Sequence, residues 1–283
     1  MNQLLKLCAF ADEADPKLDA QIDMMLSNGI PYLEMRGVDG KNVADLTDDE
    51  VKSAMDRLSA AGLKVWSLGS PAGKTKITDD FSFEEKRFAR LLHIADMTGA
   101  KCIRLFSFYG TDGSDEYFDE ICARLSRCIE MAQGHDVVLC HENEKGIYGD
   151  TAERCVKLLK ALPELKAVYD PANFLQCGED TLKAWDALAP YIYYMHIKDC
   201  ASDGRVVPPG EGVGQIPTLL SRYAKAGGGI LTLEPHLAEF VGLSDLEEEG
   251  DKSAVGGCKF ASGREAFDYA TNSIKNIIAK SVN

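Results

Sequence analysis

The sequence predicts an α/β protein with a single (β/α)8 TIM barrel spanning residues 1–283. Eight short apolar runs alternate with eight segments of helical spacing, and several of these segments end in glycine. The 283 residues, 45% of them hydrophobic, also fit the size of one such barrel. A doubly wound open sheet is the alternative, because alternation alone does not prove closure. No GxGxxG motif follows the first run to favour that alternative.

The eight predicted strands are continuous apolar runs, which is typical of parallel strands covered on both faces. They are rich in Val, Ile, Leu and aromatic residues, which favour strands. In chain order they are 4–10, 31–36, 63–68, 102–108, 136–142, 165–170, 191–197 and 229–235.

The predicted helices repeat apolar residues at spacings of three and four. Four of them run into the glycine-containing ends SNG, AAG, TGA and AGGG, and glycine is the residue that left-handed helix caps prefer. In chain order the helical segments are 16–29, 48–62, 83–99, 116–134, 151–163, 181–190, 216–227 and 264–280.

Three predicted loops are longer than usual: 70–82, 200–215 and 236–263. Each follows a strand, the third, seventh and eighth respectively. Loops after strands lie on the face where a TIM barrel carries its active site. We therefore expect these three loops to form the walls and lids of a substrate site.

The amino-acid composition limits the classes of molecule that the protein can bind. A net charge of −14 opposes binding to nucleic acid, which needs a basic surface. The apolar runs are far shorter than the roughly 18 residues of a membrane span, and the first residues lack the pattern of a signal peptide. Nine cysteines without a CxxC pair indicate reduced core thiols, so we expect a cytoplasmic protein without a membrane partner. A homo-oligomer is compatible with this, although no exposed apolar stripe identifies an interface.

Acid or imidazole side chains end the last four predicted strands: Glu142, Asp170, His196 and Glu234. Their spacings of 28, 26 and 38 residues each match one strand-plus-helix unit, so a barrel would point all four into one mouth. Three converging carboxylates repel one another unless a cation neutralises them. We predict one divalent metal ion, Mn²⁺, Mg²⁺, Co²⁺ or Zn²⁺, because these ions accept mixed oxygen and nitrogen ligands. The alternative for each residue alone is an ordinary hydrogen bond at a strand end.

Several motifs carry a family resemblance: ENEKGIYGDT, YDPANF, HIKD followed by GRVVPPGEG, and LEPH. Together they resemble the sugar phosphate isomerase/epimerase superfamily with the xylose isomerase-like barrel, which includes ketose 3-epimerases and relatives of endonuclease IV. The resemblance covers nearly the whole chain. It implies that Glu142, Asp170, His196 and Glu234 hold the metal and that Glu142 and Glu234 are also the catalytic acid and base.

The chemistry implied is isomerisation or epimerisation of a ketose or ketose phosphate. A cation that chelates the carbonyl and the adjacent hydroxyl stabilises the enediolate formed when one glutamate removes a proton. The other glutamate then returns a proton to the opposite face. Three alternatives remain: an inosose-type dehydratase, an endonuclease IV-like phosphodiesterase, and a non-catalytic sugar-binding barrel. The phosphodiesterase is disfavoured by the charge of −14 and by only five histidines.

Eight further polar residues are candidates for contact with a small sugar or sugar phosphate. Those on the third and fourth strand ends would meet a phosphate or carboxylate, unless they are simply solvated. Arg205 resembles an arginine that the epimerase branch uses near the substrate. The candidates are Glu34, Ser70, Lys74, Arg104, Asn173, Lys198, Arg205 and His236.

Two residues near the predicted site have two possible roles each, and a third is excluded from it. Glu34 contacts a sugar hydroxyl or pairs with Arg36. Asp199 orients a metal ligand or pairs with Lys198. His141 precedes Glu142, so strand alternation turns it away from the mouth and we exclude it from the metal site.

Overall fold

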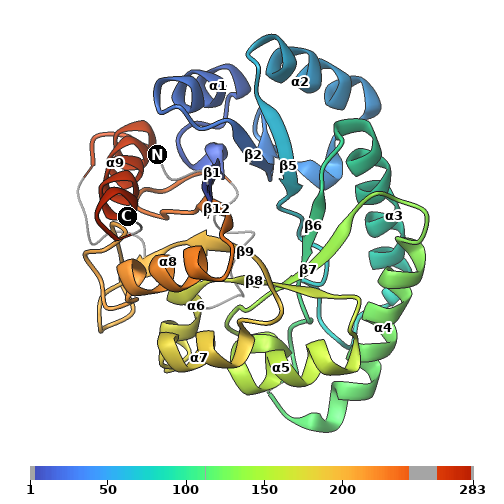
Figure 1. Cartoon of the computed structure of the whole chain (residues 1–283). Coiled ribbons are helices and arrows are strands. Elements are labelled where there is room, and N and C mark those ends of the chain that lie inside the picture. The colour runs from blue at the N-terminus through green and yellow to red at the C-terminus, as the bar shows by residue number, and fades with distance from the viewer. Residues whose placement is uncertain (1–3, 112, 242–259, 282–283) are drawn as a thin grey trace.

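Eight parallel strands close into a barrel in the computed structural model, which describes residues 4–111, 113–241 and 260–281. Around the barrel the strands follow the order β1-β12-β9-β8-β7-β6-β5-β2, so neighbours in the sequence are neighbours in the sheet (Figure 1). This closure confirms the predicted TIM barrel and excludes the open sheet. Each of the eight strands lies within the apolar run that predicts it. The strands are β1 (Leu5–Ala9), β2 (Tyr32–Met35), β5 (Lys64–Leu68), β6 (Cys102–Leu105), β7 (Val138–Glu142), β8 (Lys166–Tyr169), β9 (Ile192–Ile197) and β12 (Gly229–Leu233).

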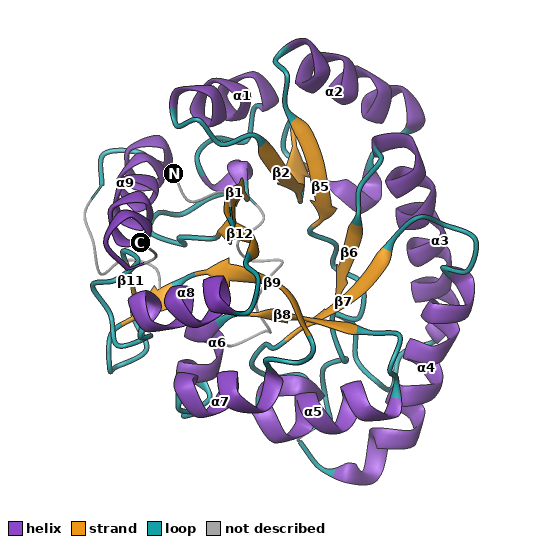
Figure 2. Cartoon of the chain, viewed as in Figure 1, coloured by secondary structure: helices purple, strands orange, loops and turns teal. Residues whose placement is uncertain are grey.

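Helices surround the barrel as an outer ring (Figure 2). The last helix meets the first, because Arg264 Nη1 lies 2.8 Å from Asp23 Oδ2. Eight helices match the predicted segments, whereas the short helix α6 was not predicted. The helices are α1 (Leu18–Ser27), α2 (Asp48–Ala60), α3 (Phe81–Thr98), α4 (Phe118–Met131), α5 (Ala152–Ala161), α6 (Pro171–Gln176), α7 (Thr181–Leu188), α8 (Ile216–Lys225) and α9 (Gly263–Ser281).

Local signals explain where helices begin and end. At α2, the Thr47 side chain accepts from the Glu50 N–H while the Glu50 side chain accepts from the Thr47 N–H, which is a capping box. At the end of α3, Gly99 adopts a left-handed φ of 68°, a conformation that costs glycine little. At the start of α3, the Asp80 side chain accepts from the Ser82 N–H and caps the helix. The predicted loop 70–82 thus ends two residues earlier than expected, at Asp80.

Two small antiparallel hairpins lie in the loops after β2 and β9. They pair β3 (Gly37–Val38) with β4 (Lys41–Asn42), and β10 (Asp199–Cys200) with β11 (Val206–Val207). Of the predicted loop 236–263, residues 242–259 lie outside the described residues.

Asp199 anchors the loop 200–215. Its carboxylate accepts the backbone N–H groups of Cys200 (2.9 Å), Gly210 (2.8 Å), Gly212 (3.1 Å) and Gly214 (2.9 Å). A Cβ added at Gly212 or Gly214 would overlap the same carboxylate. The glycines of PPGEGVG therefore let the backbone wrap closely around one buried acid.

Two apolar layers form the core of the barrel, and a third small cluster joins Val206 and Leu237 to Ala266 and Ala270 of α9. The larger lies between strands and helices, and a smaller one fills the barrel interior with Cys8, Cys102, Cys140, Val168, Tyr194 and Ile230. The eight described cysteines are free thiols, and Cys258 lies outside the described residues. Within the described part of the chain, no helix has the length and apolarity needed to cross a bilayer.

Candidate metal centre

Four side chains converge above the interior layer, at the ends of β7, β8, β9 and β12. Glu142, Asp170, His196 and Glu234 each offer a ligand atom, and these atoms all lie within 4.8 Å of one another. All four residues are buried. Cys140, Val168 and Tyr194 precede three of them by two residues and fill the barrel below, as strand alternation requires.

His196 lies at the centre of this group. Its Nδ1 is 2.7 Å from Glu142 Oε1 and 3.2 Å from Glu234 Oε2. Asp170 divides its two oxygens: Oδ1 accepts from the Asn173 N–H at 3.0 Å and so caps helix α6, while Oδ2 lies 2.9 Å from Lys198 Nζ.

Each carboxylate of the group also contacts a cation. Arg104 Nη1 lies 3.1 Å from Glu142 Oε2, and Arg36 Nη1 lies 3.1 Å from Glu234 Oε1. Lys198 Nζ reaches Glu234 Oε2 at 3.4 Å. The three cationic side chains are at most 5% exposed, so these pairs lie in a low-dielectric interior where unpaired charge would be costly.

Burial and charge together perturb the pKa values. Burial raises the pKa of Asp170 to about 6, although the Lys198 ammonium lowers it. Burial acts in the same direction on Glu142 and Glu234, but His196 with Arg104 or Lys198 outweighs it and leaves both pKa values below their usual range. Burial lowers the pKa of His196, yet the nearby glutamates raise it overall. The carboxylates around His196 therefore favour its protonated form when no metal is bound.

The donor set fits a divalent ion. Glu142 Oε2 and Asp170 Oδ2 make ionic contacts but, among the described residues, accept no hydrogen bond. Three carboxylates and one imidazole are donors that Mn²⁺, Mg²⁺, Co²⁺ and Zn²⁺ accept. Glu142, Asp170, His196 and Glu234 would hold such an ion.

A second group of ligand atoms comes from Glu13, Glu234 and His236, again within 4.8 Å. The guanidinium of Arg36 contacts both acids of this group, at 3.1 Å in each case. Burial lowers the pKa of His236 well below its usual value, which favours the neutral ring. The second group is thus already neutralised by a side-chain cation.

The candidates for a phosphate site are engaged with protein groups. The Ser70 hydroxyl donates to the backbone oxygen of Arg104. Lys74 Nζ lies 3.2 Å from Glu144 Oε2 and 4.6 Å from the Phe106 ring centroid. Arg104, Lys198 and His236 all lie at the mouth and contact carboxylates of the cluster.

Of the other three candidates, Asn173 and Glu34 adjoin the cluster, through Asp170 Oδ1 and His196 Nε2 respectively, and Arg205 has no contact with it among those described. Asn173 Nδ2 donates to the Asn143 backbone oxygen at 2.9 Å. Arg205 is exposed and pairs with Asp203 at 2.7 Å. Glu34 is inside the barrel, beneath His196.

Two expected pairings differ in the structure. Arg36 pairs with Asp12, Glu13 and Glu234 rather than with Glu34, since Glu34 points into the barrel one layer below. Asp199 neither orients a metal ligand nor pairs with Lys198, because its oxygens are taken by the loop backbone.

His141 points away from the mouth. Its Nε2 lies 3.0 Å from Ser107 Oγ, and that hydroxyl also accepts the Gly149 N–H at 2.8 Å. A Cβ added at Gly149 would overlap the imidazole ring. Burial lowers the pKa of His141 to about 4. This histidine therefore anchors the loop that follows Glu142.

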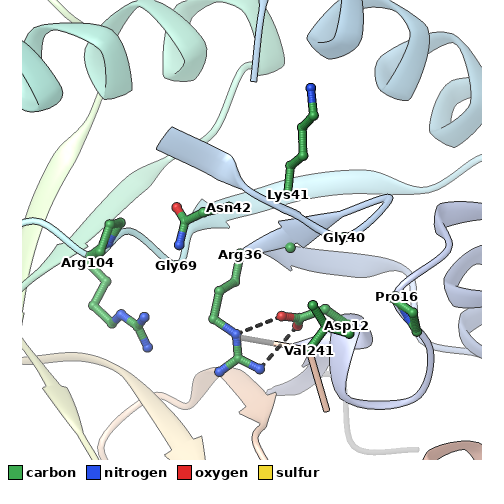
Figure 3. A pocket seen from close by; sticks show the side chains of 11 residues that line it. Asp12, Pro16, Arg36, Gly40, Lys41, Asn42, Gly69, Arg104 and Val241 are labelled. Carbon is green, nitrogen blue, oxygen red and sulfur yellow. Dashed lines mark hydrogen bonds and ion pairs between the residues drawn. The ribbon is translucent and has the colours of Figure 1, made fainter. Parts of the chain in front are cut away.

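Arg36, Asp12 and Glu13 also belong to the site, although no motif in the sequence marks them. The one signal for them is their position just after the first two strands. Arg36 lies between the rings of Phe10 (4.2 Å) and Phe240 (4.7 Å). Beside it is a cavity of about 100 Å³, which Asp12, Asn42 and Arg104 also line. Figure 3 shows Arg36 and Arg104 extending toward the same end of this cavity, whereas Lys41 points away.

Comparison with known proteins agrees with this architecture. A family model described as xylose isomerase-like TIM barrel matches residues 22–254. None of the curated protein sequences compared with the chain matches it.

Solved structures share the fold at low identity. D-allulose 3-epimerase from Methylomonas sp., solved with D-allulose, is 16% identical, with a TM-score of 0.74 over 98% of this chain and 97% of that chain. The IolI protein, solved with a zinc atom, is 16% identical, with a TM-score of 0.74 over 98% of this chain and 99% of that chain. The probable 3-DHS dehydratase AsbF from Bacillus anthracis is 16% identical, with a TM-score of 0.71 over 98% of this chain and 99% of that chain.

Proposed function

Because the chain belongs to the xylose isomerase-like TIM barrel family, we propose that it is a divalent-metal-dependent isomerase or epimerase of a ketose. The observation that carries this proposal is the buried cluster of Glu142, Asp170, His196 and Glu234, whose ligand atoms lie within 4.8 Å. Two members of the cluster are glutamates, the number that a two-base epimerisation needs. The fold shared with D-allulose 3-epimerase agrees with this chemistry.

In the proposed reaction, Glu142 and Glu234 exchange protons with the carbon next to the substrate carbonyl. One removes a proton and the other returns one to the opposite face, which inverts the centre. A divalent ion, when bound, supplies positive charge that stabilises the enediolate. Arg104 lies 3.1 Å from Glu142 Oε2, and Arg36 lies 3.1 Å from Glu234 Oε1. These contacts fix both carboxylates for proton transfer.

We favour an unphosphorylated ketose over a ketose phosphate. Lys74 is neutralised by Glu144, Arg104 by Glu142, and the Ser70 hydroxyl is used by a backbone oxygen. A phosphate would have to displace one of these partners. The cavity beside Arg36 is instead lined by Asn42 and by Asp12, whose oxygens accept from Arg36 but have further lone pairs that sugar hydroxyls can use.

Solvent exchange tests the proposal. In ²H₂O with Mn²⁺, the protein should incorporate deuterium next to the carbonyl of a ketose, and a chelator should stop the incorporation. Glu142→Gln or Glu234→Gln should reduce the rate by about 10²–10⁴-fold, the usual contribution of a general acid or base. Glu144→Gln is the matched control, since Glu144 pairs with Lys74 outside the cluster, and it should keep most of the activity.

The outcomes separate the alternatives. Exchange that persists in both glutamate variants contradicts the two-base mechanism. A product that has lost water identifies a dehydratase, and binding of ketoses without any exchange identifies a sugar-binding barrel. Faster exchange with ketose phosphates than with ketoses contradicts the assignment of a neutral substrate.

A further inference from the structure

Glu34 is a buried carboxylate that the proposed reaction does not use. It lies on β2 inside the barrel, and its side chain is 0% exposed. Its Oε2 is 3.4 Å from His196 Nε2, the other ring nitrogen from the one that faces Glu142 and Glu234. This ionic contact places a carboxylate beside Nε2, which makes no hydrogen bond among the described residues. The imidazole thus has a carboxylate on each side.

Three hydroxyl groups hold this carboxylate in place. The Tyr194 hydroxyl donates to Oε1 at 2.7 Å, and the Ser67 hydroxyl lies 3.3 Å from the same oxygen. The Thr232 hydroxyl donates to Oε2 at 2.8 Å. The donors come from β5, β9 and β12, so the barrel itself positions Glu34, which has no access to substrate.

The imidazole ring is fixed as well. Phe10 packs edge-on against it, with ring centroids 5.2 Å apart and an interplanar angle of 78°, and Tyr194 does the same at 5.4 Å and 68°. A ring flip would turn Nδ1 away from the cluster and place carbon beside both carboxylates. Nδ1 therefore stays toward the mouth and Nε2 toward Glu34.

We propose that Glu34 is a positioning residue that keeps a proton on Nε2 of His196 and thereby reserves Nδ1 as the metal ligand. A neutral imidazole carries one N–H, and a carboxylate acceptor beside Nε2 stabilises the tautomer with the proton there. The ion then binds Nδ1, while the Nε2 proton remains opposite Glu34. This inference rests on the proposed metal centre and on no particular substrate.

Nitrogen NMR of the wild-type protein labelled with ¹⁵N-histidine tests the tautomer directly. After saturation with Zn²⁺, the histidine whose signals respond to the ion should show a protonated Nε2 and a metal-bound Nδ1. A metal-bound Nε2, or a wild-type protein that binds no ion, overturns the inference. Because no substrate is involved, absent ketose turnover with normal Zn²⁺ binding would count against the proposed reaction alone.

Glu34→Gln tests the residue itself by calorimetric titration with Zn²⁺ and Mn²⁺. The amide can donate to Nε2 and so favours the wrong tautomer, and metal affinity should fall by about 10–100-fold, as for other carboxylate partners of a ligating histidine. Ser67→Ala is the matched control, because it removes a donor to Glu34 but leaves the contact with His196. Equal affinities and the same histidine spectrum in wild type and a folded Glu34→Gln would overturn the proposal.

Discussion

Replacing Asp199 by alanine should strongly destabilise the protein, since this side chain holds the loop 200–215. Four backbone N–H groups lose their acceptor, those of Cys200, Gly210, Gly212 and Gly214. At a net value of about 1 kcal/mol for each bond, the loss is about 4 kcal/mol. For a chain of this size, that corresponds to a fall in Tm of roughly 7 °C.

Reversible urea unfolding followed by circular dichroism measures this loss. Asp203→Ala is the control, because Asp203 lies in the same loop but is exposed and pairs only with Arg205 among the contacts described for it, and its unfolding midpoint should match wild type. Asp199→Asn keeps an acceptor oxygen and should fall between the two. A free energy of unfolding for Asp199→Ala within about 1 kcal/mol of wild type would refute the anchoring role.

Three other predictions follow from contacts around the site. His141 has a pKa of about 4, below its usual 6.5, so its contribution to stability is present above pH 6.5 and lost as the pH falls toward 4; the stability difference between wild type and His141→Gln should shrink by about 3 kcal/mol over that range in urea titrations. Gly149→Ala should cost about 1–3 kcal/mol through overlap with His141, and a constant Tm would contradict this. Mn²⁺ at 100 times its Kd should stabilise the protein by about 2.7 kcal/mol in thermal scans, and a chelator should reverse the effect.

Most of the fold could be predicted from the sequence because barrel strands are buried on both faces and appear as uninterrupted apolar runs. Helix α6 could not be predicted from periodicity, because its six residues are too few to show a helical repeat. Its signal was present in Asp170 followed by Pro171, an N-cap residue before a proline at the first helical position. Asp170 belongs both to this helix cap and to the candidate metal site, so one motif carries two signals.

The site was only partly predictable because strand alternation gives the face of a residue but not its depth. Glu34 and Arg36 share a face, yet the first lies inside the barrel and the second at the mouth, one layer higher. The same holds for Tyr194, His196 and Lys198 along β9 and beyond. Depth depends on how far each strand is shifted against its neighbours, and β2 shifts register against β5 between Leu33 and Glu34.

The two carboxylate oxygens of Asp170 have different roles, since Oδ1 caps a helix and Oδ2 faces Lys198 in the candidate metal site. One is tied to the N-terminus of helix α6, and the backbone of the same residue is clamped by the Asn143 amide through two bonds of 2.9 Å. The side-chain torsions of this acid are therefore set when the helix forms, long before any ion arrives. The rotational entropy of the carboxylate is lost during folding, so an incoming cation meets a preorganised oxygen and gains affinity without ordering it.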